Sequence, residues 1–383
     1  MKISYKIIII IFFTIVISGE KLTASEKIKI GLLVPMTGQY QDVGQSIIRS
    51  VRLAIQKIDN SNLEILPKDT RGQPLDTLKS AKELSEQGVK IIIGPVFNKN
   101  LIYLNELKDV FFISLTNKVI KNPKNIISAG INAESQLRAI NKFKKSNNIT
   151  KTFFLVPNSD FKEEIDYAIT QSKIKLKHKY TYDSDPTLLT KQIEKITKYS
   201  QRKRNLNDEI NRIKNSEDSN KEQKIKNLEK KYTLGGINFD SVIISDFEES
   251  LKSVFTSLLY TDVSPKRVYY ITLNQWFDQS LLNEKSLQPI YFPSINKENF
   301  DEFIDEYSKI YKEKPNQLSF LSYDLVGLVY YLIFKNQFKI DEKIFYEKNK
   351  FKGKVGIFEI NKNKINHILN FYKVENGEFK KIF

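Results

Sequence analysis

The fold of this 383-residue chain is decided by an early apolar strand and the loop after it, Lys29-Ile30-Gly31-Leu32-Leu33-Val34-Pro35-Met36-Thr37-Gly38-Gln39-Tyr40. A helical pattern follows, because apolar residues recur at helical spacing at Ile47, Ile48, Val51, Ala54 and Ile55. The alternation repeats at 63–84 and at 90–107, where a helix is expected over 101–107, and it ends with a strand at 111–114. Fully apolar strands that alternate with helices predict a parallel sheet covered by helices on both faces.

A second unit of the same kind follows the first. Four further apolar strands are expected, at 151–158, 176–182, 239–246 and 266–272, with helices between them. The chain finishes with a small antiparallel arrangement that turns at Asn376-Gly377, a pair typical of tight hairpins. The sequence therefore predicts an α/β protein with two lobes, each a parallel sheet flanked by helices.

The loops at the ends of the strands are the expected binding surface. Ligands of parallel sheets lie beyond the carboxyl ends of the strands. In the first unit these ends are followed by Met36–Tyr40, Val96–Asn100 and Ser114–Asn117. We expect these three loops to face whatever the protein binds.

A charged segment, 188–232, interrupts the second unit. Its apolar residues recur every three or four positions, at Leu206, Ile210 and Ile213 and again at Ile225, Leu228 and Tyr232. A polar turn at 215–220 separates the two runs, so the segment predicts a helical hairpin inserted into lobe two. The hairpin is either a docking arm for a partner or a solvated insertion without a role, and the sequence favours neither.

The composition excludes several functional classes. The chain has no cysteine, which excludes disulfides, thiolate catalysis, cysteine-bound zinc and a lipobox cysteine. Its two histidines, His178 and His367, are far apart, so we expect no histidine-based metal site or triad. No dinucleotide, phosphate-loop or nucleophile-elbow motif occurs in the sequence. A non-catalytic protein without cofactors is expected.

The net charge of +16 admits two interpretations. The lysines are dispersed and no nucleic-acid-binding motif is present, which favours a generally basic composition and no nucleic-acid partner. Binding of an anionic polymer through the basic surface is the alternative, and it would depend strongly on salt.

The first 24 residues have the three-part form of a secretory signal peptide. Lys2 and Lys6 precede the apolar run Ile7–Ile17, and the small residues Ala24 and Ser25 follow it. The run is shorter than the roughly 20 residues of a membrane span. We expect cleavage near Ala24 and a periplasmic protein without a stable membrane span; the alternative is an uncleaved anchor.

Taken together, these patterns resemble type I periplasmic binding proteins of the leucine-binding-protein group. The resemblance rests on Gly31–Gly38 with Gly44, Asp69 with Gly72, Ile93-Gly94-Pro95, Ser114–Asn117, Tyr323-Asp324 and Gly353–Ile360. It implies two lobes joined by three chain crossings. Lobe one would comprise 28–132 and 293–350, and lobe two 133–292 and 351–383. The ligand of this family lies in the cleft between the lobes, which closes about a hinge.

Within this group the chain most resembles the binding domain of penicillin-binding-protein activators. The shared features are the inserted hairpin, Phe239-Asp240-Ser241-Val242, Asn274-Gln275-Trp276 and Gln288–Pro293. Such proteins regulate cell-wall synthases, so the resemblance implies a cell-envelope regulator with a synthase as its partner. The alternative is a substrate-binding protein that delivers an amino acid or another small polar solute to an ABC permease.

The resemblance also implies which residues line the cleft. Amino-acid receptors of the family use hydroxyl groups after the third and fourth strands and an acid from lobe two. Here the third loop has no hydroxyl, the fourth keeps two, and Asp160 or Asp246 fits the acid. The expected cleft residues are Thr37, Gln39, Tyr40, Phe97, Asn98, Ser114, Thr116, Asn117, Asn158, Asp160, Asp246 and Tyr323.

Several of these residues also have a structural interpretation. Ser114 and Thr116 could cap a following helix. Tyr40 could pack on the lobe surface and Tyr323 in the core. We expect Trp276, the only tryptophan, to pack in the core or between the lobes and not to hold a ligand.

Overall fold

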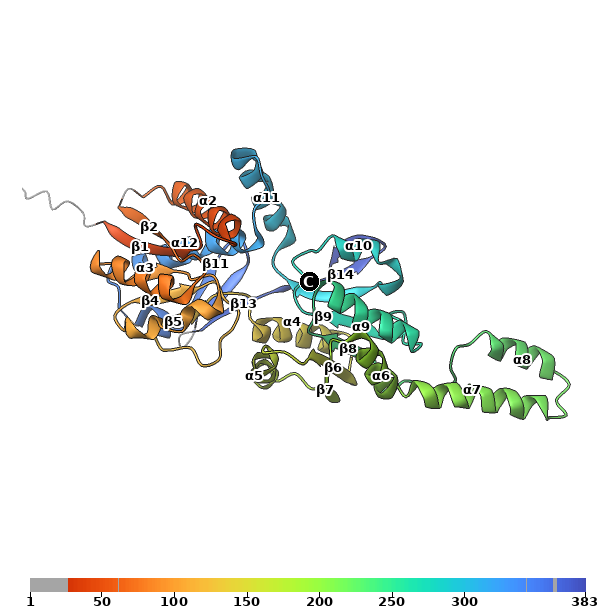
Figure 1. The fold of residues 1–383 in the computed structure, drawn as a ribbon. Coiled ribbons are helices and arrows are strands. Elements are labelled where there is room, and N and C mark those ends of the chain that lie inside the picture. The colour runs from red at the N-terminus through yellow and green to blue at the C-terminus, as the bar shows by residue number, and fades with distance from the viewer. Residues whose placement is uncertain (1–26, 61, 342, 361–363) are drawn as a thin grey trace, which may run out of the picture.

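The computed structural model describes residues 27–60, 62–341, 343–360 and 364–383. The expected signal peptide and its cleavage site near Ala24 lie outside the described residues. Two lobes lie side by side, and a pair of helices projects from the second lobe (Figure 1).

Lobe one is built on a five-stranded sheet of order β2-β1-β3-β4-β5. Neighbouring strands are parallel throughout, and the central strands are buried because each carries an unbroken apolar run. The parallel sheet expected from the alternating pattern is therefore confirmed. Its strands are β1 (Ile28–Val34), β2 (Leu63–Asp69), β3 (Ile91–Ile93), β4 (Phe111–Ser114) and β5 (Ile126–Ser128).

Helices cover both faces of this sheet. One face carries α2 (Gln41–Ile58), which packs along α12 (Gln317–Lys335). The other carries α3 (Pro74–Glu86) and two short 3₁₀ helices, η1 (Asn98–Leu101) and η2 (Leu104–Glu106).

The two 3₁₀ helices replace the single helix expected over 101–107, so that prediction is wrong. The physical reason is the position of Leu101 and Leu104, which are both buried against the sheet. A 3₁₀ helix has three residues per turn, so it places residues i and i+3 on the same face in a very short segment.

Helix α12 is apolar enough over 19 residues to meet the length and composition of a membrane span, and it is the one helix of the described residues that does. Most of its apolar window is buried, against α2 and the sheet of lobe one. It is therefore the core helix of that lobe.

Lobe two is built on a seven-stranded sheet of order β15-β14-β10-β9-β8-β6-β7. The first five strands along the chain run parallel, and β14 and β15 extend the sheet antiparallel. Asn376 and Gly377 join β14 to β15 with φ angles of 56° and 74°, which confirms the expected tight turn. The strands are β6 (Thr152–Pro157), β7 (His178–Tyr182), β8 (Ser241–Ile244), β9 (Tyr269–Thr272), β10 (Ile290–Ser294), β14 (Asn370–Glu375) and β15 (Glu378–Lys381).

Helices also flank the sheet of lobe two. They are α4 (Ala133–Ser146), α5 (Lys162–Ser172), α6 (Pro186–Thr197), α9 (Glu248–Tyr260), α10 (Ser280–Asn283) and η3 (Lys285–Leu287). Two further helices precede and follow α12 in the sequence, namely α11 (Lys297–Tyr311) and α13 (Lys343–Tyr346).

A third, three-stranded sheet lies outside both large sheets. It consists of β11 (Asn349–Lys352), β12 (Ile357–Ile360) and β13 (Ile365–Ile368). Phe351 of β11 packs against Tyr331 of α12, with ring centres 5.8 Å apart. β11, and β12 paired with it, are thus attached to lobe one, which differs from the expected boundary at 351. β13 lies against α4, and the chain enters the lobe-two sheet only with β14.

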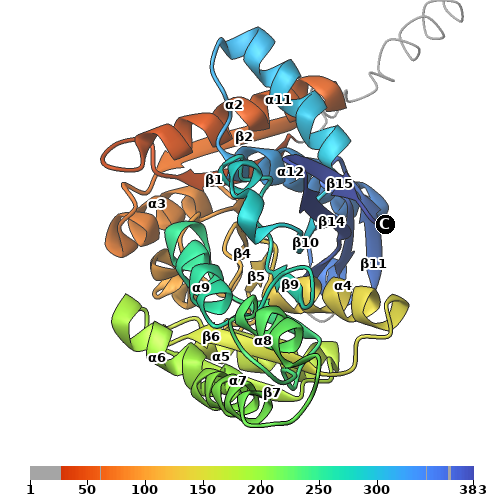
Figure 2. The ribbon, with the colours of Figure 1, turned by 90° about the vertical axis from the view of Figure 1, so that its right-hand side faces the viewer.

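The inserted hairpin consists of α7 (Tyr199–Lys214) and α8 (Lys221–Glu229). It extends away from both lobes in Figure 1 and points toward the viewer in Figure 2. Leu206, Ile213 and Leu228 form a small core of its own. The projecting part is shorter than 188–232, because α6 packs on α9 within the lobe.

The chain crosses between the lobes three times. The crossings lie between β5 and α4, between β10 and α11, and between β13 and β14. Three connecting segments therefore run between the lobes, the number that the resemblance implies.

Candidate functional site

A cavity of about 340 Å³ lies between the lobes. Lobe one contributes the loops after β3 and β4 and the start of α12, and the first crossing and a loop of lobe two complete the wall. The lining residues are Val96, Phe97, Asn98, Leu115, Thr116, Asn117, Lys118, Gly130, Ile131, Trp276, Leu318 and Leu321.

Four of the expected cleft residues line this cavity, namely Phe97, Asn98, Thr116 and Asn117. Ser114 lies behind them and is fully buried. Its hydroxyl donates to the carbonyl of Pro95 at 2.9 Å and accepts from the backbone N–H of Thr116 at 3.2 Å. Ser114 therefore shapes the loop and does not face the cavity.

The loop after β1 lies beside the cavity and not in its wall. Thr37 donates to Oδ2 of Asp69 at 2.6 Å, and Gln39 is exposed. Burial would raise the pKa of Asp69, but the bond from Thr37 and backbone N–H donors lower it. The ring of Tyr40 packs on Phe97, with ring centres 4.5 Å apart, so Tyr40 supports a residue that does line the cavity.

The expected lobe-two residues do not reach the cavity. Asn158 and Asp160 are exposed after β6. Oδ2 of Asp246 accepts a hydrogen bond from the hydroxyl of Tyr182 at 2.6 Å. Burial and this bond raise the pKa of Tyr182. The carboxylate of Asp246 is thus already engaged within its own lobe.

The pair Tyr323-Asp324 has a structural role. Asp324 is 3 % exposed and accepts from the backbone N–H groups of Lys354 and Val355 at 2.9 and 2.6 Å. A Cβ atom at Gly353 would lie 2.1 Å from its Oδ2 atom. Burial raises the pKa of Asp324 to about 6. Tyr323 lies below the ammonium of Lys354, 5.3 Å from ring centre to Nζ, and not in the cavity wall.

Two residues outside the expected set, Trp276 and Lys118, bring the most distinctive chemistry to the cavity. Lys118 directly follows the expected loop Ser114–Asn117, and no sequence pattern marked it as a site residue. Trp276 belongs to the stretch Asn274-Gln275-Trp276, which had pointed to a resemblance but not to a site. Its place in the cavity wall depends on side chains far away in the sequence.

Hydrogen bonds hold Trp276 in position. Its φ angle is +48°, and its backbone N–H donates to Oδ1 of Asn274 at 3.0 Å. Asn274 in turn receives a bond from Ser294 at 2.8 Å and donates its backbone N–H to Gln136 at 2.8 Å. Gln136 of α4 and Ser294 of β10 adjoin the first two crossings, so the tryptophan is fixed within lobe two, next to the chain that leads to lobe one.

A buried carboxylate joins the lobes next to the cavity. Glu164 of α5 is 5 % exposed and accepts the backbone N–H groups of Val119 and Ile120, each at 2.9 Å. These two residues follow β4 in lobe one. Lys121 and Glu163 form an exposed ion pair beside them at 2.7 Å. We call residues 119–121 with Glu163 and Glu164 the latch.

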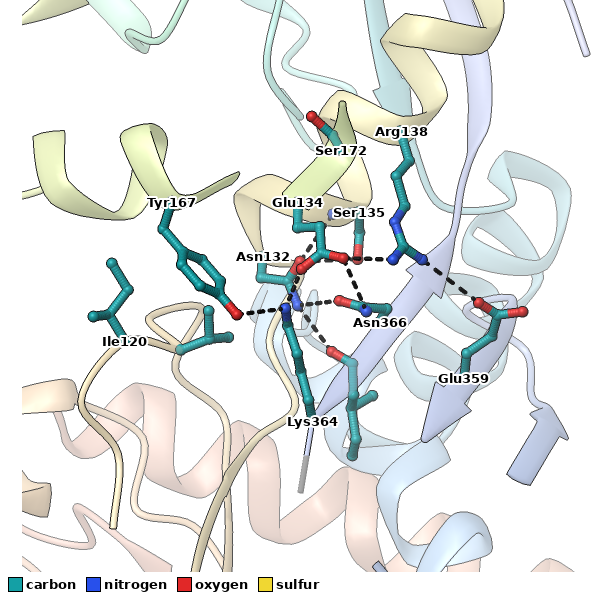
Figure 3. A network of polar contacts seen from close by, with 12 residues as sticks. Ile120, Asn132, Glu134, Ser135, Arg138, Tyr167, Ser172, Glu359, Lys364 and Asn366 are labelled. Atoms are coloured by element: carbon teal, nitrogen blue, oxygen red, sulfur yellow. Dashed lines mark hydrogen bonds and ion pairs between the residues drawn. The ribbon is translucent and has the colours of Figure 1, made fainter. Parts of the chain in front are cut away.

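The first and third crossings are tied together by a second buried carboxylate (Figure 3). Glu134 of α4 is 2 % exposed and pairs with Arg138 at 2.6 Å and with Lys364, the residue immediately before β13. The side chain of Asn132 donates to the carbonyl of Ile365 at 2.8 Å. These residues form one end of what we call the hinge cluster.

His367 forms the other end of the hinge cluster. Its backbone N–H donates to the hydroxyl of Ser135 at 2.9 Å, and its Nε2 atom lies 2.8 Å from the carbonyl of Ala129. Burial lowers the pKa of His367 to about 4. The ring is therefore neutral at pH 7, with Nε2–H donating to Ala129.

Among the described residues, no group of three or more histidine, aspartate or glutamate side chains is arranged to hold a metal ion. The lining of the cavity offers an apolar wall, amide and hydroxyl groups and one lysine.

Comparison with known proteins agrees with this architecture. The family model described as periplasmic binding protein matches residues 27–176, from β1 through α5. The chain has the type I periplasmic-binding-protein fold. No curated protein sequence matches it.

Solved structures match nearly the whole chain. The C-domain of LpoA (YraM) from Haemophilus influenzae, a regulator of PBP1A, has a TM-score of 0.62 and 13 % identity over 93 % of this chain and 100 % of that one. The leucine-binding protein LivK from Thermotoga maritima has a TM-score of 0.57 and 15 % identity, with 93 % and 98 % covered. A solute-binding protein from Rhodopseudomonas palustris in complex with 3,4-dihydroxybenzoic acid has a TM-score of 0.56 and 18 % identity, with 93 % and 96 % covered. Likeness at such identity shows a shared fold.

Proposed function

We propose that this protein is a periplasmic, non-catalytic binding protein that regulates a cell-envelope partner through the α7–α8 hairpin. The observation that carries this proposal is the anchoring of the hairpin to lobe two. Arg202, at its root, is 3 % exposed.

The guanidinium of Arg202 bonds to the end of α6, to the segment that returns from the hairpin and to the end of α9. Nε donates to the carbonyl of Thr197 at 3.1 Å, Nη1 to the hydroxyl of Thr233 at 3.0 Å and Nη2 to the carbonyl of Thr261. Burial lowers the pKa of Arg202, and the nearby charge of Asp262 opposes this. Such an anchor fixes the direction of the hairpin, which a solvated insertion without a role does not require.

The surface at the root of the hairpin has the composition of a contact site. Tyr232 and Tyr260 are 79 % and 57 % exposed. Tyr199 packs on Tyr260, with ring centres 5.4 Å apart. Tyrosine and arginine are enriched among the residues that dominate binding energy at protein interfaces. We call Tyr199, Tyr232 and Tyr260 the tyrosine cluster.

The fold shared with the LpoA domain, a regulator of PBP1A, supports the class of partner. A cell-wall synthase is therefore the first partner to test.

The test is removal of the hairpin without disturbing its root. Replacing 203–232 by a short Gly/Ser linker joins Arg202 to Thr233, whose side chains are already hydrogen-bonded. We expect this variant to lose binding to purified synthases in a biolayer assay while its thermal unfolding midpoint stays unchanged. Unchanged binding would overturn the proposal.

Point variants refine the test. Tyr232→Ala with Tyr260→Ala is expected to weaken binding, because both side chains are exposed in the tyrosine cluster. The matched control is Leu75→Ala with Ile102→Ala, two exposed apolar side chains of lobe one. Equal losses from both pairs would point to nonspecific contact and contradict the proposal.

The cavity favours a second candidate function, a receptor that delivers a small solute to an ABC permease. A receptor is stabilised by its solute, by about 2.7 kcal/mol at 100 times the dissociation constant. A solute that raises the unfolding midpoint, together with permease-dependent uptake that is insensitive to hairpin removal, would favour this function.

A further inference from the structure

We propose that the root of the hairpin, and not its tip, is the docking surface, and that it receives an acidic face of a folded protein partner. This inference rests on the proposed function, in which the hairpin carries the partner contact. It goes further in two respects, because it separates the root from the tip and states the charge that the partner must present.

Three segments of the chain meet at the base of the hairpin. Arg202 of the first segment donates to the hydroxyl of Thr233 in the second at 3.0 Å and to the carbonyl of Thr261 in the third. One buried side chain thus joins all three, and their charges act at one place on the surface. We call these segments the root; they are 198–204 at the start of α7, 230–236 after α8 and 260–267 at the end of α9 and beyond.

The charge of the root is almost entirely of one sign. Its 22 residues hold eight lysines and arginines and a single acid, Asp262, and so carry +7 of the net charge of +16. The carboxylate of Asp262 accepts from the hydroxyl of Thr233 at 2.5 Å and lies 4.0 Å from Nη1 of Arg202, so it is already engaged at the base of the hairpin. The exposed basic residues of the root, none of which pairs with a carboxylate of the described residues, are Lys198, Lys203, Arg204, Lys230, Lys231, Lys266 and Arg267.

The tip of the hairpin, residues 205–229, has a different distribution of charge. It holds five basic and six acidic residues. Arg212 pairs with Glu209 at 2.7 Å, and Lys224 pairs with Asp218. A surface of interspersed sign keeps a projecting element soluble, whereas like charges without counter-charges repel one another and attract an oppositely charged surface. The difference between root and tip therefore favours the root as the contact.

The tyrosine cluster lies within this basic surface. The ammonium of Lys203 lies 5.9 Å from the ring centre of Tyr199, which packs on Tyr260, and Lys231 directly precedes the exposed Tyr232. Aromatic side chains with a charged, solvated rim are typical of contacts between folded proteins. A flexible anionic polymer requires only the charges, so the tyrosines favour a protein as the occupant.

The two kinds of side chain should act on different rates. Charges at the rim of an interface steer association, whereas the packed aromatic residues slow dissociation. A biolayer assay with the full chain and a purified synthase measures both rates, at about 50 and about 300 mM NaCl. The association rate constant is expected to fall at least about tenfold at the higher concentration, because salt screens the steering charges.

Two triple variants of equal net charge separate the root from the tip. The root variant should lose most of the salt dependence of association, and the tip variant should behave like the wild type. Tyr232→Ala with Tyr260→Ala should instead raise the dissociation rate and keep the salt dependence. A circular-dichroism melt of each variant establishes that it is folded. The root variant combines Lys203→Gln, Lys231→Gln and Lys266→Gln, the tip variant combines Lys214→Gln, Lys221→Gln and Lys226→Gln, and all six lysines are exposed.

Poly-L-glutamate is a second probe, which tests the root without a synthase. Titration calorimetry is expected to show the root variant binding it at least about threefold more weakly than the tip variant, since each exposed ion pair contributes a small amount. Equal binding by the two variants would overturn the inference, as would association with the synthase that is insensitive to salt.

Two further outcomes separate this inference from its alternatives. Root-dependent binding of polyphosphate, combined with a synthase contact that the root variant leaves unchanged, would assign the root to an anionic polymer and overturn the inference. A synthase that does not bind the full chain at all would overturn the proposed function. The comparison of the two variants with poly-L-glutamate would then still decide whether the root is a surface for acidic polypeptides.

Discussion

The hinge cluster and the latch each hold a buried carboxylate of lobe two, and each carboxylate has a partner from another part of the chain, but the kinds of partner differ. Glu134 meets charged side chains, Arg138 and Lys364. Glu164 meets two backbone N–H groups of a lobe-one loop. The first contact ties one crossing to another, whereas the second joins a lobe-one loop to a lobe-two helix by hydrogen bonds alone.

This difference separates stability from binding. Crossings that are tied together move as a unit, so we expect the hinge cluster to support the fold in every arrangement of the lobes. The loop held by Glu164 begins directly after Lys118. The latch therefore positions the lysine of the cavity, and its loss should act on ligand affinity more than on the fold.

The largest expected effect is that of Glu134→Ala. It leaves Lys364, whose side chain is 19 % exposed, without its buried partner. Breaking a buried pair in this way costs about 3–5 kcal/mol. Urea denaturation measures the loss, and Lys364→Met added to Glu134→Ala should recover part of it. A loss below about 1 kcal/mol would show that the cluster is not the main support of the crossings.

The second effect is a dependence of stability on pH through His367. Its folded pKa of about 4 lies below the ordinary value of 6.5, so the unfolded chain binds more protons between these pH values. The contribution of His367 to the free energy of unfolding is therefore complete above pH 6.5. It is lost as the pH falls toward 4, and the loss amounts to about 3 kcal/mol.

The variant His367→Gln isolates this effect, because its amide can still donate to the carbonyl of Ala129. Asp324, with its raised pKa, acts in the opposite direction over the same range, losing stability as the pH rises through 6. The difference between the wild type and the variant, measured by urea midpoints from pH 4 to 7, removes that contribution. A difference independent of pH would contradict the assignment.

A smaller effect on stability is expected from Glu164→Ala in the latch. It leaves the N–H groups of Val119 and Ile120 without an acceptor, which costs about 2 kcal/mol. The affinity of the cavity for a small ligand should fall as well, because Lys118 in its wall loses the support of the latch. Glu164→Gln keeps an acceptor oxygen and should retain most of both properties; if it behaves like the alanine variant, charge and not positioning is what matters.

The smallest effect is that of the exposed pair in the latch. Lys121 and Glu163 hydrogen-bond to each other, and this bond raises the pKa of Lys121 and lowers that of Glu163. Both side chains are exposed to solvent, where ion pairs contribute little and are screened by salt. Lys121→Gln should leave the urea midpoint and the ligand affinity unchanged. A clear loss of either would show that the exposed pair, and not Glu164 alone, holds the loop in place.

The fold was predictable because its signals are local. The apolar strands and their intervening helices define both lobes, and Asn376-Gly377 defines a turn by itself. The 3₁₀ helices before β4 and the placement of β11–β13 were not predictable, since they depend on which distant helix the apolar residues meet. Phe351, for example, packs on Tyr331 of α12.

The site was predictable only in part, for the same reason. Ligands of parallel sheets lie beyond the carboxyl ends of the strands, and this principle predicted four residues that do line the cavity, Phe97, Asn98, Thr116 and Asn117. Asp246 looks available in the sequence, but it is engaged by Tyr182, sixty-four positions away. Trp276 is held at the cavity by a hydrogen bond to Asn274, whose own backbone N–H donates to the distant side chain of Gln136. Such pairings have no periodicity, so no pattern in the sequence reveals them.

The three crossings also constrain the order in which the chain can fold. The face of β1 that carries Ile30 and Leu32 is covered first by α2, and its cover is completed only when α12 arrives, nearly three hundred residues later. The lobe-two sheet likewise waits for β14. Neither lobe can complete its core while the chain is still emerging, and contacts of such long sequence separation form slowly. We therefore expect the nascent chain to stay open until almost all of it is available, the state in which a chain can be threaded through a narrow channel.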